Sequence, residues 1–404
     1  MNYEISTKEK RHVLFVFLCV FCLFFAVFHT SQVHGASKAV KYNGKTIARY
    51  NSSRQMVLIP SKNASTNYWN LMHLISGNKK KTVVIPKGSK ISLSGTLRPG
   101  NNTTIIAKGA TVIGKKESNI IFGAPNKKLK NLSVIGGKWR SPDKGGRTGS
   151  LFAFSYVNGL VMDGINCNAN YRGHAIEIIA CKNVTIKNSK VFAIGSNPKT
   201  CQEEQIQIDL ATKKTAPKIA EFGKKYVQGQ TCRNVSIINN TVTGARAVGV
   251  NWSNSENNKW RSKFHKNIVI QGNTLTGTTA EALSYFNVIG GKIVDNTIKT
   301  KAVRADQGDS HTIGIHAALC GKAPKEMAGS SLLISGNRVW GNRNGIHIMG
   351  YFDKSKKECI SRFGKVQVLN NKVYCRQGAE QGIVQVKQSC RIFEESGNQI
   401  ASWK

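Results

Sequence analysis

Short runs of alternating apolar and polar residues recur along this chain, and each run is closed by Asn or Gly. The clearest copies begin at Asn183 (NVTIKN), Asn234 (NVSIINN) and Asn267 (NIVIQGN). Looser copies begin at Asn131, Asn158, Gly291, Ser331 and Lys365. The period of two predicts β-strands. A unit this small cannot bury its apolar face alone, so the repeats predict a solenoid of stacked units.

Each repeat contains a second short strand. These strands start at His174, Glu204, Arg246, Glu281, His311 and Asn344. Alternation points five pairs toward a common core: Ile176/Ile178, Ile206/Ile208, Val248/Val250, Ile313/Ile315 and Ile346/Ile348. Two or three strands per turn predict an all-β fold, a parallel β-helix solenoid. A short helical pattern over residues 68–75 predicts a capping helix at its N-terminal end.

The N-terminus differs from the rest of the chain. Lys8, Lys10 and Arg11 precede an apolar run of residues 13–28, which is short for a membrane span. This pattern predicts a signal peptide over residues 1–36, and therefore a secreted or cell-surface protein. An uncleaved anchor is the alternative, and it is the one membrane contact that the sequence offers. We expect an N-terminal extension at 37–64, one β-helix domain at 65–404, and a monomer.

Eight cysteines follow the signal segment. Outside the cell such a set indicates disulfides. Cys181 and Cys232 each stand two residues before the repeat Asn, so they are expected on adjacent coils, at a spacing of about 4.8 Å that a disulfide can bridge. The alternative is a buried pair of free thiols. The sequence contains no HxxxH, and no CxxC outside the signal segment, so it offers no zinc-binding pattern and no metal site is predicted.

The chain is strongly basic, with 59 Lys and Arg against 21 Asp and Glu and a formal charge of +38. Such a field attracts polyanions. No helix-turn-helix, zinc finger or RNP-like pattern is present, so nucleic acid is not the expected partner. Together with secretion, the charge predicts an acidic polysaccharide. The alternative is a generally basic, solvated surface, because the lysines are spread along the chain.

Three further phrases carry a family resemblance: TVVIPKG from Thr82, GTL from Gly95 and NNTTII from Asn101. With the repeats and the signal peptide, they resemble the right-handed parallel β-helix proteins of the pectin-lyase-like superfamily over about residues 65–395. EEQIQI from Glu203 resembles the Asp-Asp-Cys-Ile-x-Ile element of polygalacturonases. His174 stands near that family's first catalytic Asp, and Arg246 replaces the His of its Gly-His-Gly.

The departures from that pattern limit what the resemblance implies. No Arg-Ile-Lys stands where Ser284, Tyr285 and Phe286 do. The phrases GHAIE and IQID are closer to a group of uncharacterised bacterial secreted β-helix proteins. The resemblance therefore implies the fold, and only a distant likeness to polygalacturonases in chemistry.

The predicted strands also place polar residues in columns on stacked coils. One outward column holds Glu177, Gln207, Gly249 and Gly314, with His347 further along; the next holds Asp209, Asn251 and His316. A third column consists of the residues that start these strands, from His174 to Asn344. Strict alternation directs these residues inward, so a bend at the preceding turn is needed for them to point outward. Two carboxylates across a scissile bond can act as acid and base or nucleophile. The candidate catalytic residues are Glu204, Asp209, Glu177, His174 and Arg246. The alternative is an ionic ladder that only satisfies strand ends.

Residues around these columns suit a sugar ligand, because aromatic faces pack on sugar rings and Arg forks onto carboxylates. The candidate substrate-binding residues are Arg172, Tyr171, Gln207, Asn251, Trp252, Glu281, Tyr285, His311 and His316. The Lys-rich insertion at 211–231 is expected to form one rim of the groove.

These patterns predict a secreted protein that binds an acidic polysaccharide and cleaves it by glycoside hydrolysis, without a cofactor. A first alternative is a polysaccharide lyase, with Arg246 or a nearby His as base and calcium held on carboxylates such as Glu177 and Asp209. A second is a surface adhesion protein whose groove holds glycan without chemistry.

Overall fold

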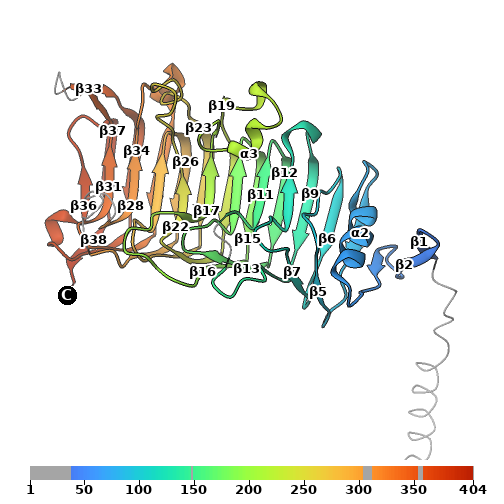
Figure 1. Cartoon of the computed structure of the whole chain (residues 1–404). Helices are drawn as coiled ribbons and strands as arrows, with labels where there is room; N and C mark the ends of the chain where they lie inside the picture. The colour runs from blue at the N-terminus through green and yellow to red at the C-terminus, as the bar shows by residue number, and fades with distance from the viewer. Residues whose placement is uncertain (1–37, 147–148, 304–311, 354–357, 404) are drawn as a thin grey trace, which may run out of the picture.

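The strands stack along one axis, from the blue N-terminal end to the red C-terminal end of Figure 1. This computed structural model describes residues 38–146, 149–303, 312–353 and 358–403. Within them each coil contributes strands to three long sheets, named A, B and C here, in which the stacked coils pair in parallel. The expected right-handed parallel β-helix is confirmed. The predicted signal peptide lies outside the described residues.

In the part of the chain that the structure describes, no helix has the length and apolar character needed to cross a membrane.

Sheet A runs the length of the described chain. Its first two strand pairs are antiparallel and the third strand joins the parallel stack, so residues 39–58, expected as an extension, are part of the sheet. Among the described residues its strands are β1 (Ala39–Tyr42), β2 (Lys45–Tyr50), β3 (Met56–Leu58), β4 (Lys81–Val84), β6 (Thr103–Ile106), β9 (Lys130–Ile135), β12 (Asn158–Asp163), β15 (Lys182–Lys187), β20 (Arg233–Ile238), β23 (His265–Gln271), β26 (Val288–Val294), β29 (Ser331–Ser335), β34 (Phe363–Leu369) and β37 (Cys390–Ser396).

Sheets B and C complete the coils. Sheet B consists of β5 (Lys90–Ser92), β7 (Thr111–Ile113), β10 (Lys138–Arg140), β13 (Asn166–Asn170), β16 (Lys190–Ile194), β21 (Thr241–Gly244), β24 (Thr274–Gly277), β27 (Thr297–Thr300), β30 (Arg338–Gly341), β35 (Lys372–Cys375) and β38 (Gln399–Ser402). Sheet C consists of β8 (Ile121–Gly123), β11 (Phe152–Ser155), β14 (Ile176–Ile179), β17 (Glu204–Asp209), β22 (Arg246–Val250), β25 (Leu283–Phe286), β28 (Ile313–Ala318), β31 (Asn344–Met349) and β36 (Ile383–Gln385).

The predicted capping helix is present as α2 (Ala64–Ile75), about one turn longer than the sequence pattern. The side chain of Asn63 accepts a hydrogen bond from the Thr66 amide and so caps the first turn. Leu71 and Ile75 are buried, so α2 covers the first coils as expected. The remaining short elements are α3 (Pro217–Ala220), η1 (Pro125–Lys127), η2 (Lys224–Tyr226), η4 (Lys325–Gly329), η5 (Ala379–Gln381), and the hairpins β18 (Ala211–Thr212) with β19 (Gln228–Gln230) and β32 (Tyr351–Asp353) with β33 (Glu358–Ser361).

The asparagines of the repeat have two structural roles. Asn183, Asn234 and Asn267 adopt positive φ, a backbone conformation that Asn tolerates better than most residues. Their amides bond from coil to coil, with 2.9 Å from Asn234 to Asn183 and 3.0 Å from Asn267 to Asn234. The Asn that closes the phrase forms a second, buried ladder, in which Asn240 donates to Asn273 and Asn273 to Asn296 at 3.0 Å each. These ladders satisfy the polar groups at the turns.

The predicted core pairs are confirmed at the centre of sheet C. Ile176 pairs with Ile206 and Ile178 with Ile208, and all four are fully buried. The column that aligned Gly314 with His347 is wrong by two residues, because His316 pairs with His347 and Ile315 with Ile346. A shift of two keeps every side chain on its face, so alternation alone could not detect it.

Cys181 and Cys232 lie on adjacent coils, since the Arg233 amide donates to the Cys181 carbonyl at 3.0 Å. Of the two alternatives that the sequence left open, the structure has the buried pair of free thiols. Each Sγ donates to backbone carbonyls instead, to Phe154 at 3.4 Å from Cys181 and to Asp209 at 3.6 Å from Cys232. Burial raises the pKa of Cys181 to about 12, which keeps its thiol protonated and unreactive.

Candidate functional site

The candidate site lies on the outer face of sheet C. Paired residues on consecutive strands form one outward column: Glu177, Gln207, Gly249, Ser284, His316 and His347. His316 therefore belongs to this column and not to that of Asp209, and Gly314 is not a member; both corrections follow from the two-residue register shift. The His316 ring lies 5.2 Å from the His347 ring and 5.0 Å from the Phe286 ring.

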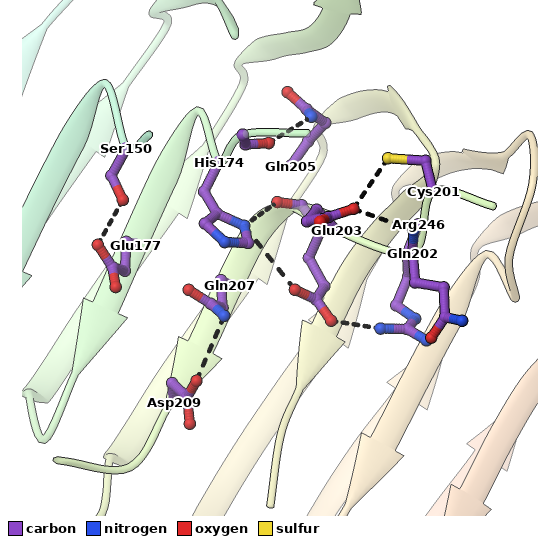
Figure 2. A network of polar contacts seen from close by, with 12 residues as sticks. Ser150, His174, Glu177, Cys201, Gln202, Glu203, Gln205, Gln207, Asp209 and Arg246 are labelled. Carbon is purple, nitrogen blue, oxygen red and sulfur yellow. Dashed lines mark hydrogen bonds and ion pairs between the residues drawn. The ribbon is translucent and has the colours of Figure 1, made fainter. Parts of the chain in front are cut away.

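An ionic ladder crosses the strand starts of the same sheet, as Figure 2 shows in part. Arg246 donates to the carboxylate of Glu204 on the preceding coil and, at 2.9 Å, to that of Glu281. His174 Nδ1 lies 2.6 Å from the Glu204 carbonyl and 3.8 Å from its carboxylate. Glu204, Arg246 and Glu281 are 5%, 7% and 1% exposed. The ionic ladder that the sequence left open as an alternative is therefore present, and it is buried.

A glycine explains how Glu204 reaches the outer face. Strict alternation directs Glu204 inward, two positions before buried Ile206. Gly249 lies between inward Val248 and Val250, so a Cβ there would point outward, and it would collide with Cγ of Glu204. The side chain of Glu204 therefore occupies the space above Gly249. The side chain of this strand-start residue therefore points outward, as the column requires.

Asp209 is the most perturbed carboxyl of the site. It is 3% exposed and accepts from the Leu210 amide at 2.6 Å. It also accepts from Gln207 Nε2 at 3.3 Å, as drawn in Figure 2. Burial raises the pKa of Asp209 well above its usual range, and the charges of Glu204 and Glu177 raise it further. A carboxyl with a raised pKa can hold a proton near neutral pH and act as a general acid.

Glu203, which precedes this strand, has the opposite perturbation. Burial alone would raise its pKa, but a hydrogen bond from Cys201 Sγ at 2.9 Å and one from the Gln202 amide at 3.1 Å outweigh it, so the pKa lies below the usual value. In the sequence Glu203 stands out only as the first residue of EEQIQI, and it is not among the candidate catalytic residues. Its cysteine partner carries no sequence signal.

A cavity of about 210 Å³ lies beside the half-buried Glu177. Ser150 Oγ donates to the Glu177 carboxylate, as drawn in Figure 2. The cavity lining includes Phe122, Ala153, Pro217, Lys218 and Ile219. Ala216 and Ile219 pack with Ile179 of sheet C, which holds the insertion over the sheet. The insertion at 211–231 thus forms a rim, as expected.

A second, open hollow of about 810 Å³ lies between this insertion and the loop at 251–263. Four lysines line it: Lys213, Lys214, Lys224 and Lys259. Glu256 is the one acid among the lining residues. Four cations around one hollow create a local positive potential that attracts anions. The sequence predicts a rim here, but nothing in it indicates that Lys259 lies beside the lysines of the insertion.

The aromatic candidates are distributed differently from the expectation. Tyr285 is wrong as a substrate contact: it pairs with core residue Val250, is 1% exposed, and its hydroxyl donates to the Ile268 carbonyl at 2.8 Å. The assignment failed because Tyr285 occupies an inward position. Trp252 is half-buried under the guanidinium of Arg261, at 5.3 Å from its ring centre.

The other binding candidates lie around the ladder. Arg172 is exposed and Tyr171 is half-buried, with its carbonyl accepting from Cys201 Sγ at 2.8 Å. Asn251 is half-buried and its carbonyl lies 3.0 Å from His265 Nε2. His311 lies outside the described residues.

Within the described residues, no three His, Cys, Asp or Glu side chains are grouped so that they could hold a metal ion.

Comparison with known proteins identifies the fold. No family model matches the chain. A curated relative, plasmin and fibronectin-binding protein A of Streptococcus pneumoniae, is 25% identical over 203 residues, which are 47% of this chain and 26% of that protein. The chain therefore spans about a quarter of the relative that it matches.

Two solved structures are similar at low sequence identity. The S. pneumoniae surface protein and adhesin PfbA has a TM-score of 0.51 at 16% identity, covering 83% of this chain and 92% of that one. The mannuronan C-5 epimerase AlgE4 A-module of Azotobacter vinelandii has a TM-score of 0.50 at 12% identity, covering 83% and 84%. Identities this low show the fold alone. This chain is a right-handed parallel β-helix protein with the fold of the pectin-lyase-like superfamily.

Proposed function

We propose that this chain is an extracellular protein that binds an acidic polysaccharide across the outer face of sheet C and the rim beside it. The observation that carries the proposal is the hollow lined by four lysines and one glutamate. A polyanion placed there would be attracted by local charge and by the overall charge of +38. The exposed Arg172 adds a planar donor that can fork onto a carboxylate.

Binding is favoured over cleavage because of the ionic ladder. Glu204 and Glu281 share the guanidinium of Arg246, and all three are nearly inaccessible to solvent. A carboxylate held in a buried ion pair is a poor nucleophile or base, since its charge already has a partner. By name, one similar protein is a surface adhesin, which supports binding, and another is an epimerase of mannuronan, which supports an acidic polysaccharide as the partner but not binding alone. We propose a cell-surface location by the same comparison.

The binding experiment uses the chain without residues 1–36 and compares two charge-matched triple variants. K213Q/K214Q/K224Q removes three lysines of the hollow, and K138Q/K190Q/K372Q removes three exposed lysines of sheet B. The hollow variant is expected to bind polygalacturonate about 10-fold or more weakly, from roughly 0.5 kcal/mol or more per exposed ion pair. Wild-type affinity should fall as salt rises. Equal losses in the two variants would attribute binding to net charge and remove the hollow from the proposal.

Glycoside hydrolysis is the second candidate, and Asp209 favours it. Its raised pKa suits a general acid, and Glu177, on the adjacent coil, is a half-buried carboxylate beside a cavity. Reducing ends released from polygalacturonate, alginate and heparin would be measured for wild type, D209N and E177Q. Hydrolysis predicts saturated ends and a loss of about 100- to 10,000-fold in D209N. Ultraviolet-absorbing ends would indicate a lyase instead, and no release with binding retained would leave the adhesion function.

A further inference from the structure

Three cations occupy the same position on three consecutive strands of sheet A. Lys182 on β15 pairs with Arg233 on β20, and Arg233 pairs with Lys266 on β23. Neighbouring strands lie about 4.8 Å apart, so the three residues form a column of like charges along the solenoid axis. We call this column the cation ladder. Lys182 and Arg233 are exposed, and Lys266 is half-buried.

The cation ladder borders a cleft of about 460 Å³. Lys263 adds a fourth cation to the lining, and Glu326 is the one acid. Glu326 is already paired with Lys266 at 2.6 Å. Within the described residues, Lys182, Arg233 and Lys263 have no ion-pair partner. The cleft therefore presents three uncompensated cations.

The fold does not need cations at these positions. The strand before the ladder, β12, places the neutral Asn158 opposite Lys182 in the same column. Stacked like charges repel one another, and directly opposed ones destabilise a sheet. The ladder therefore carries a cost that a bound anion would offset, whereas a neutral residue would satisfy the strand equally well.

The surroundings of the ladder indicate the kind of anion. Ala180, Phe264, Ile289 and Pro324 give the cleft an apolar part beside its cations. An extended glycan has ring faces that pack on such a surface and anionic groups that project to the side. Single-stranded nucleic acid needs open aromatic faces for its bases. Here Phe264 is 6% exposed, and the Tyr156 ring already lies edge-on against Tyr226.

We propose that the cation ladder and its cleft form a second binding site, for a glycan segment that carries closely spaced sulfate or carboxylate groups. The site is separate from the lysine hollow described above. Gly229, Gln230 and Thr231 line the cleft, whereas Lys224, Val227 and Gln228 line the hollow, so the end of one insertion lies between the two. The inference goes beyond the proposed function, because it stands on different residues and on another sheet.

The test compares three charge-matched variants of the chain without residues 1–36. K182Q/R233Q/K263Q removes the uncompensated cations of the cleft, and Lys266 is left in place to keep Glu326 paired. K213Q/K214Q/K224Q and K138Q/K190Q/K372Q remove equal charge from the hollow and from sheet B. The probes are heparin for sulfates, polygalacturonate for carboxylates, neutral dextran, and single-stranded DNA. Circular dichroism and urea midpoints establish that each variant folds.

The cleft variant is expected to lose about 10- to 100-fold in affinity for heparin, for polygalacturonate or for both, from roughly 0.5 to 1 kcal/mol per ion pair. The sheet B variant should lose less than about 3-fold, because only its long-range field changes. Which of the two probes responds identifies sulfate or carboxylate as the ligand group. Equal losses in the cleft and sheet B variants, unchanged glycan binding, or a selective loss for DNA alone would each overturn the proposal. Loss in the hollow variant only would overturn it and leave the proposed function standing.

Discussion

The buried ion pairs of Arg246 lead to a strong prediction about stability. Replacing Arg246 by Met removes the partner of Glu204 and of Glu281, whose exposed fractions are 5% and 1%. Both carboxylates would then remain buried without the guanidinium, and Glu204 would keep only His174 at 3.8 Å, which is a cation when protonated. Loss of one partner from a buried ion pair costs about 3 to 5 kcal/mol, and here two carboxylates lose the same partner. We therefore expect R246M to be destabilised by about 4 kcal/mol or more.

A neutral version of the ladder provides the matched control. In E204Q/R246M/E281Q no charge remains to be buried, and replacement of buried ion pairs by neutral groups is often close to neutral. This triple variant should recover most of the stability, to within about 2 kcal/mol of wild type. Stability would be measured by urea unfolding, followed by circular dichroism, with the shift in midpoint converted through a common slope.

Two results would contradict this reasoning. A loss below about 1 kcal/mol in R246M would mean that water reaches both carboxylates and that the ladder behaves like a surface ion pair. A triple variant as unstable as R246M would mean that packing by the Arg246 stem, rather than charge, supports the coils. Glycan binding by a stable triple variant would further separate the ladder's structural role from recognition.

Three further predictions concern pH and packing. Because the pKa of Asp209 is raised, the native state holds this proton more tightly than the unfolded chain, so the associated stability is present at low pH and is lost as pH rises above the unfolded value of about 4. Urea midpoints should therefore favour wild type over D209N more at about pH 5 than at about pH 7. Burial lowers the pKa of His265 to about 4, so the stability that neutral His265 contributes is present above about pH 6.5 and is lost as pH falls toward 4. In the same measurement, H265Q should remove up to about 3 kcal/mol of the loss of stability in acid, and an unchanged pH profile would contradict the burial argument. Gly249→Ala should cost about 1 to 3 kcal/mol because its Cβ would collide with Glu204, whereas Gly329→Ala, with open space around it, should be nearly neutral by thermal unfolding.

Much of the candidate site could be anticipated from the repeats. Alternation in HAIEI and IQID correctly placed Glu177 and Gln207 as neighbours on adjacent coils, since both strands share one register. The same alternation misplaced His316, which pairs with Ser284. The placing of Tyr285 beside the groove was a different error, because that residue pairs with inward Val250. A pattern with period two cannot tell a register from one shifted by two, because the same faces are buried in both.

The partners of individual side chains lay beyond any sequence argument. That Glu204 turns outward depends on the empty space above Gly249, one coil away and 45 positions along the chain. The backbone carbonyls that accept from the Cys181 and Cys232 thiols likewise belong to neighbouring strands. Such contacts join residues that are distant in sequence, and loop lengths decide which of them meet.

The amino-acid sequence by itself determined the solenoid, the inward faces of its central strands and the positive field around it, because a repeated alternation can be buried only by stacking and because charge is additive along a chain. Only the tertiary structure decided how that charge is distributed. It brought Lys259 to the insertion lysines and aligned Lys182, Arg233 and Lys266 in one column. The physical reason is that coil stacking converts separations of 33 to 51 residues into neighbouring strands about 4.8 Å apart, so the local chemistry depends on the register and on the loops between coils.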